Sequence, residues 1–193
     1  MKKTFKKIKK ITTYIISFIL SLIIIYYAVT SNINKLPNLD YIDNDLNEIN
    51  IYNYEKAYVS RIVDGDTIEV IISNKKYKVR FIGVNCPEYT SKVEYYGKES
   101  TEYTTNLLKN KYVYLEKDIS NTDKYNRLLR YIWLEIPNNN SVEETQNKMF
   151  NSILLSNGYA QIATYPPDIK YVDIFKDISI KARKNNTGLW NKQ

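Results

Sequence analysis

The strongest constraint on the fold is a series of three short β-branched runs in the middle of the chain. They are YVSRIV (58–63), TIEVIIS (67–73) and YKVRFIGV (77–84), and the segments DGD and NKK separate them. Val, Ile, Thr and aromatic residues favour strands, whereas Asp, Gly and Asn favour tight turns. The pattern therefore predicts a three-stranded antiparallel meander.

The sequence after this meander alternates between helical and strand patterns. Two further segments have the composition of strands, 112–118 and 127–136. Three segments have the pattern of helices, 96–110, 142–158 and 171–188. Five strands and three helices indicate an α+β domain in which a small barrel packs against helices.

The first thirty residues have the pattern of a membrane segment. Six lysines lie within the first ten residues, and residues 11–29 contain no charge. As a helix, this apolar stretch would span about 28 Å, close to the hydrocarbon thickness of a bilayer. We expect an uncleaved anchor, and the alternative is a cleaved signal peptide with Ala28, Val29 and Thr30 near its cleavage site. In both cases the lysines stay in the cytoplasm and the following residues are exported.

These patterns divide the chain into three parts. Residues 1–30 are the anchor or signal peptide, residues 31–57, rich in Asn and Asp, are a linker, and residues 58–193 are the folded domain. The predicted location is therefore a domain held outside the cytoplasm by the N-terminal helix, or a secreted domain if that segment is cleaved.

The residues that the chain lacks exclude several kinds of chemistry. Histidine is absent and Cys86 is the only cysteine. This excludes Ser-His and Cys-His catalysis, His-ligated zinc and internal disulfides. From Tyr58 onward, 20 Lys and Arg residues outnumber 16 Asp and Glu residues, which mildly favours an anionic partner. Any chemistry must use carboxylates, cations, hydroxyls or a metal held by oxygen.

Three polar motifs lie where the predicted strands begin or end. The segment 64–67 (DGDT) joins the first two strands, Asn85 and Glu88 follow the third, and the segment 123–127 (DKYNR) precedes the fifth. Taken alone, the first is typical of a plain hairpin turn and the last of a polar turn.

The third strand presents a problem of direction. A strict period of two places Arg80 and Asn85 on opposite faces of the strand. Gly83 lies between them, and a glycine inside a strand often marks a bulge or a break that redirects the chain.

Together, the three motifs resemble the staphylococcal nuclease (thermonuclease) family. The resemblance extends from about Tyr58 to Asn191 and includes the terminal segment TGLW. It implies an OB-type five-stranded barrel with three helices, and a Ca²⁺-dependent activity that hydrolyses the phosphodiester bonds of DNA and RNA. It implies no obligate protein partner.

The resemblance also implies a metal site. Asp66, Asn85 and the backbone carbonyl of Cys86 would bind the ion, and Asp64 would lie beside them. Such oxygen ligands suit Ca²⁺. Many members have aspartate where this chain has Asn85, so one fewer negative ligand predicts weaker metal binding. Cys86 replaces a residue that is often threonine, which changes little if only its carbonyl is used.

The same resemblance implies how the substrate is held. Arg80 and Arg127 would bind the scissile phosphate, and Glu88 would position or deprotonate the attacking water. Two guanidinium forks can absorb the charge that develops on the phosphoryl oxygens. Asn126 replaces the usual glycine of its turn, and asparagine tolerates positive φ well. The residues that match other substrate contacts are Lys124, Tyr125 and, as a stacking face, Tyr165.

Two alternatives to an enzyme remain. An OB-type barrel can also be a catalytically inactive module that binds nucleic acid or protein. The joint presence of Arg80, Glu88 and Arg127 favours the enzyme, because a binding module does not need this combination. A membrane-surface adhesion domain is a third possibility, which only the many tyrosines support.

Overall fold

The computed structural model describes residues 19–27, 53–90, 92–139 and 141–191. The chain divides into two compact units, residues 1–48 and 49–193. In the first unit, residues 19–27 are helical. No helix within these described ranges is both long and apolar enough to span a membrane. Most of the predicted anchor and linker lies outside the described residues, so both stay predictions.

Five strands close into a barrel, as the sequence predicts. In order around the barrel they are β1 (Tyr54–Asp64), β2 (Thr67–Ile72), β3 (Lys75–Phe81), β6 (Leu128–Trp133) and β5 (Tyr112–Glu116). Neighbouring strands are antiparallel except β3 and β6, which are parallel. Parallel strands need a long crossover connection, and the chain between β3 and β6 contains helix α3 (Gly97–Leu108).

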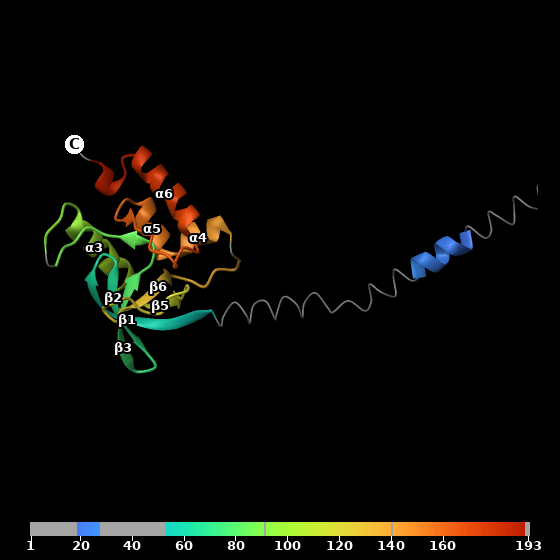
Figure 1. Cartoon of the computed structure of the whole chain (residues 1–193), viewed down its shortest axis with the longest axis horizontal. Coiled ribbons are helices and arrows are strands. Elements are labelled where there is room, and N and C mark those ends of the chain that lie inside the picture. The colour runs from blue at the N-terminus through green and yellow to red at the C-terminus, as the bar shows by residue number, and fades with distance from the viewer. Residues whose placement is uncertain (1–18, 28–52, 91, 140, 192–193) are drawn as a thin grey trace, which may run out of the picture. The chain divides into compact units, whose positions relative to one another are not determined.

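Alternate residues of the barrel strands form the core. The side chains of Val59, Ile68, Val70, Val79, Val113 and Ile132 are fully buried. Because strand side chains alternate between faces, the intervening residues point outward. A second, two-stranded sheet pairs β4 (Val84–Asn85) with β7 (Gln161–Ile162). Figure 1 shows α5 (Phe150–Ser156) and α6 (Val172–Lys184) together on one side of the barrel, while the β2–β3 hairpin projects away from them.

The prediction of a single helix over residues 142–158 is wrong, and so is the predicted count of three helices. This segment forms two helices, α4 (Val142–Lys148) and α5, because Met149 adopts an extended conformation with φ −85° and ψ 118°. Met149 is fully buried and bridges Trp133, and the Leu134 N–H donates to the Lys148 carbonyl. The end of β6 therefore uses this segment as a hydrogen-bonding partner, and tertiary pairing outweighs local helix propensity. A short 3₁₀ helix, η1 (Gly188–Trp190), follows α6.

The turn between β2 and β3 is also shifted from its predicted place. The two turn residues are Ser73 and Asn74, with φ of 46° and 64°. Positive φ at both positions matches the right-handed twist of a hairpin. Lys75 and Lys76, predicted to lie in this turn, are therefore the first residues of β3.

The first strand begins at Tyr54, four residues before the predicted domain boundary. Tyr54 is buried and packs edge-on against Trp133 at 5.8 Å between ring centroids. The first four residues of β1 pair with β5, from Tyr54 opposite Glu116 to Ala57 opposite Val113. The strand thus begins inside the segment predicted to be a linker.

We predict that a fragment beginning at Tyr58 is much less stable than residues 49–193. The shorter fragment lacks the buried Tyr54 ring and four pairs of the β1–β5 ladder, and losing one large buried aromatic side chain alone costs about 3–5 kcal/mol. Urea unfolding followed by tryptophan fluorescence, to which both Trp133 and Trp190 contribute, measures the difference. Superimposable unfolding curves for the two fragments would contradict it.

Candidate active site

The β1–β2 turn is held from two directions. Its two central residues are Gly65 and Asp66, and the Thr104 hydroxyl in α3 donates to the Gly65 carbonyl at 2.8 Å. A Cβ atom on Gly65 would lie 2.7 Å from Cys86 Cβ, so glycine is required by the approach of Cys86. The turn is therefore fixed against the segment that follows β3.

Asp66 is the buried acid of this turn, with 5% of its surface exposed. Its Oδ2 lies 2.8 Å from Arg80 Nη1 and accepts a hydrogen bond from the Cys86 N–H at 2.7 Å. Burial raises the pKa of the Asp66 carboxyl to about 7, while the Arg80 guanidinium acts in the opposite direction. Asp64 lies beside Asp66, because its Oδ1 accepts a hydrogen bond from the Asp66 N–H at 3.1 Å.

Arg80 and Asn85 are brought together, although a strict strand period places them on opposite faces. Arg80 Nη2 donates to Asn85 Oδ1 at 2.9 Å, and Nη1 donates to the Val84 carbonyl at 3.0 Å. Gly83 makes this possible because it turns the chain between β3 and β4 with φ +77°, and a Cβ at this position would also clash with the ring of Phe175. The glycine thus redirects the chain, and Asn85 lies in the separate strand β4.

Glu88 is oriented by its own loop. Its Oε1 accepts hydrogen bonds from the N–H groups of Tyr89 and Thr90 and from the Thr90 hydroxyl, the last at 2.6 Å. Glu94 fixes the backbone of Glu88, since Glu94 Oε2 accepts a hydrogen bond from the Glu88 N–H at 3.1 Å. The carboxylate therefore has a defined orientation at the edge of the site.

Arg127 is oriented by Asp123. Both Nε and Nη2 lie 2.7 Å from Asp123 Oδ2. Burial would raise the pKa of Asp123, but hydrogen bonds from Arg127 and Tyr125 outweigh it and lower the pKa. Asn126 has φ +61°, so the predicted tolerance of asparagine for this turn is confirmed.

All predicted catalytic and metal-binding residues line one recess of about 240 Å³. The β1–β2 turn, the end of β3 with the loop after it, and the turn before β6 supply its walls. The lining residues are Asp64, Asp66, Thr67, Arg80, Asn85, Cys86, Glu88 and Arg127. Carboxylates and guanidinium groups therefore face a common space, although they come from segments up to 63 residues apart.

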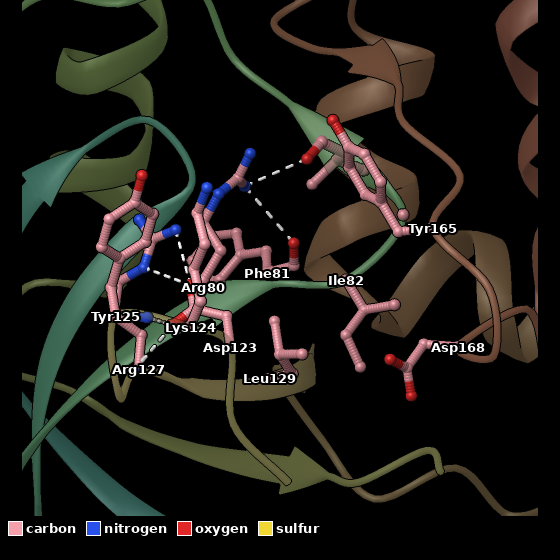
Figure 2. Close-up of a pocket in the computed structure, with 12 residues that line it drawn as sticks. Arg80, Phe81, Ile82, Asp123, Lys124, Tyr125, Arg127, Leu129, Tyr165 and Asp168 are labelled. Carbon is pink, nitrogen blue, oxygen red and sulfur yellow. Dashed lines mark hydrogen bonds and ion pairs between the residues drawn. The ribbon is translucent and has the colours of Figure 1, made fainter. Parts of the chain in front are cut away.

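A larger pocket of about 530 Å³ adjoins this recess and shares Arg80 and Arg127 with it. The predicted substrate-binding residues Lys124, Tyr125 and Tyr165 all line it. Figure 2 shows Tyr125, Lys124 and Arg127 at one end and Tyr165 nearer the other. Lys124 Nζ lies 5.0 Å from the centre of the Tyr125 ring, so a cation and an aromatic face are presented together.

The oxygen atoms of the smaller recess fit a hard divalent cation. Asp64 and Asp66 carry carboxylates and Asn85 an amide oxygen, and these residues line the recess together with Cys86. Arg80 binds Asp66 Oδ2 and Asn85 Oδ1, so a cation would compete with its guanidinium for these two oxygens. Burial disfavours the charged form of Asp66, and a bound cation would offset this. Across the described ranges, no cluster of three or more His, Cys, Asp and Glu side chains has metal-site geometry. A site here would thus depend on the neutral oxygens of Asn85 and Cys86.

Sequence reasoning missed the residues that orient the functional groups. Asp123 was part of a recognised motif, and its spacing of four from Arg127 could have suggested the pair. Thr90, which binds Glu88, and Thr104, which holds Gly65, carry no such signal. Thr104 is 39 residues from Gly65, so only the fold brings them together.

Comparisons with known proteins identify relatives of this chain. The family described as Staphylococcal nuclease homologue matches residues 78–192. A thermonuclease from Staphylococcus intermedius is 34% identical over 141 residues, covering 72% of this chain and 77% of the relative. A thermonuclease from Staphylococcus hyicus is 31% identical over 186 residues, covering 95% and 99%. Endonuclease YncB from Bacillus subtilis (strain 168) is 34% identical over 139 residues, covering 69% and 61%.

Proposed function

The chain belongs to the staphylococcal nuclease family, and on this premise we propose that it is a nuclease that hydrolyses phosphodiester bonds of DNA and RNA with Ca²⁺. The observation that carries this proposal is the shared recess, where Arg80, Arg127 and Glu88 face the oxygens of Asp66 and its neighbours. A module that only binds nucleic acid needs cations, but it does not need an oriented carboxylate beside them.

The two arginines supply the electrostatic part of the reaction. Negative charge grows on the phosphoryl oxygens as the bond to the leaving group breaks, and guanidinium forks bind such oxygens in pairs. Asp123 fixes the plane of the Arg127 guanidinium before substrate arrives. Arg80 lines both the recess and the larger pocket. It would therefore lie between the reacting phosphate in the recess and the part of the substrate in the pocket.

Glu88 supplies the proton acceptor or the orienting group for water. The Thr90 hydroxyl and two backbone N–H groups bind one of its oxygens and set the direction of the carboxylate. Asp66, Asn85 and the Cys86 carbonyl, with Asp64 nearby, would hold the cation. A Ca²⁺ ion bound there would supply further positive charge to the phosphate.

We also propose that the domain acts outside the cytoplasm. The support is the sequence of residues 1–30, in which six lysines precede a long uncharged apolar stretch. In this view residues 1–30 hold the nuclease at the membrane unless they are cleaved. Degradation of the domain by protease added to intact cells tests its location, and complete protection would contradict it.

The central prediction is that activity depends on Ca²⁺. We expect the chain to degrade both single-stranded DNA and RNA in Ca²⁺, to lose activity in chelator and to recover little in Mg²⁺, which prefers strict octahedral geometry. Release of acid-soluble nucleotides measures this. Glu88→Gln is the matched control, because it keeps the shape of the side chain and removes its charge. Full activity in chelator, or equal activity in the Gln variant, would refute the proposal.

A second prediction concerns the two arginines and Asp123. Arg80→Lys and Arg127→Lys keep the charge but lose the planar fork, so kcat should fall on the order of 10²-fold. Asp123→Asn leaves Arg127 in place but weakens its orientation, and we expect a smaller loss of about tenfold. Steady-state kinetics and unfolding curves separate these effects from loss of the fold.

Arg61→Lys is the control for these arginine variants. Arg61 is an exposed arginine paired with Glu69 on the outward face of β1 and lies outside both recesses. Its replacement should leave kcat unchanged. Near-normal turnover in both the Arg80 and Arg127 variants would remove them from the assigned roles.

A further inference from the structure

The outward face of β3 carries a line of three cations. Val79 and Phe81 are buried in the barrel, so the alternate residues Lys76, Lys78 and Arg80 point outward. Successive members of this line are about 6.6 Å apart along the strand. That spacing is similar to the separation of neighbouring phosphates along an extended single strand of nucleic acid.

The charges of the two lysines are not neutralised by the surrounding strands. Glu69 lies opposite Lys78 in β2, but the Arg61 guanidinium binds its carboxylate at 3.0 Å. Lys76 lies opposite Ile71. Both lysines are exposed, and within the described part of the chain no acid forms an ion pair with either of them.

This line is continuous with the candidate active site. Arg80, its last member, lines both recesses. In the parallel pairing of β3 with β6, Val79 lies opposite Leu128, so Lys78 is level with Arg127. The β2–β3 hairpin projects from the barrel, as Figure 1 shows. Residues 73–78 at its end are exposed. A strand held by Arg80, Arg127 and the Tyr125 ring can therefore continue along β3.

We propose that the outward face of β3 is a binding track for single-stranded nucleic acid, in which Lys78 and Lys76 contact successive phosphates beyond the active-site recess. The proposal rests on the proposed nuclease function and extends it. A row of cations along one strand, next to an aromatic face, matches the combination that binds single strands without regard to sequence. Substrates long enough to reach the track are then bound more tightly than short ones.

The test measures binding without cleavage. Fluorescence anisotropy of labelled oligothymidylates bound to the full chain in chelator is compared for the wild type and the variant Lys76→Gln/Lys78→Gln. Each lost contact to a single-strand phosphate reduces the slope of log K against log salt by about 0.7. We expect the slope to fall by about 1.4, so the wild type loses about sevenfold more affinity than the variant over a fourfold rise in salt.

The matched control is Lys75→Gln/Lys109→Gln, which removes the same number of charges. Lys75 alternates to the other face of β3, and Lys109 caps the end of α3. We expect this control to keep the wild-type slope, and both double variants to cleave substrates too short to reach Lys78 at the wild-type rate. Equal slopes in the two double variants would overturn the track.

A second arm separates nucleic acid from a membrane surface. Sedimentation with phosphatidylcholine vesicles containing phosphatidylserine is compared for the same substitutions in residues 49–193, because the predicted anchor in residues 1–30 would itself bind the vesicles. If Lys76→Gln/Lys78→Gln lowers only vesicle binding and leaves oligonucleotide binding unchanged, the line of lysines faces a membrane and the proposal is wrong. Because the anisotropy measurement needs no cleavage, a chain without nuclease activity would contradict the proposed function while the track is still tested.

Discussion

The buried ion pair between Asp66 and Arg80 is the interaction on which the rest of the site depends. It joins the β1–β2 turn to the end of β3 at 2.8 Å. Removing one partner of such a pair leaves an uncompensated charge and costs about 3–5 kcal/mol. The Cys86 N–H and the Thr67 hydroxyl bind the carboxylate, while Asn85 binds the guanidinium. The pair therefore sets the positions of the residues around it.

Each arginine of the site is oriented by an acid from the protein itself. Asp66 holds Arg80 in the wall of the recess, and Asp123 holds Arg127 at the turn before β6. Orientation before binding matters because long side chains otherwise lose conformational entropy when they bind a phosphate. The arrangement is consistent with a site whose cations are placed for the charge of the transition state. It also couples the barrel to the candidate site, since the β3–β6 pairing sets the distance between the two arginines.

Several features were predictable because they depend on neighbours along the chain. The strands followed from β-branched runs, and the polar residues at strand ends marked where the site lies. Gly83 was predicted to redirect the chain before Asn85, and its φ of +77° confirms this, but the contact that excludes a side chain there comes from the Phe175 ring in a distant helix and was not predictable. The break at Met149 likewise follows from pairing with β6, which no local pattern encodes.

The sequence by itself determined that five barrel strands form and which chemical groups are present: carboxylates, guanidinium groups and amide oxygens, with no histidine. These are local or compositional properties. The tertiary structure decided which of those groups share a recess, which acid orients each arginine, and that the row of Lys76, Lys78 and Arg80 leads into the recess that also contains Arg127. The reason is barrel closure, because strand register fixes the positions of side chains whose residues are far apart in the chain.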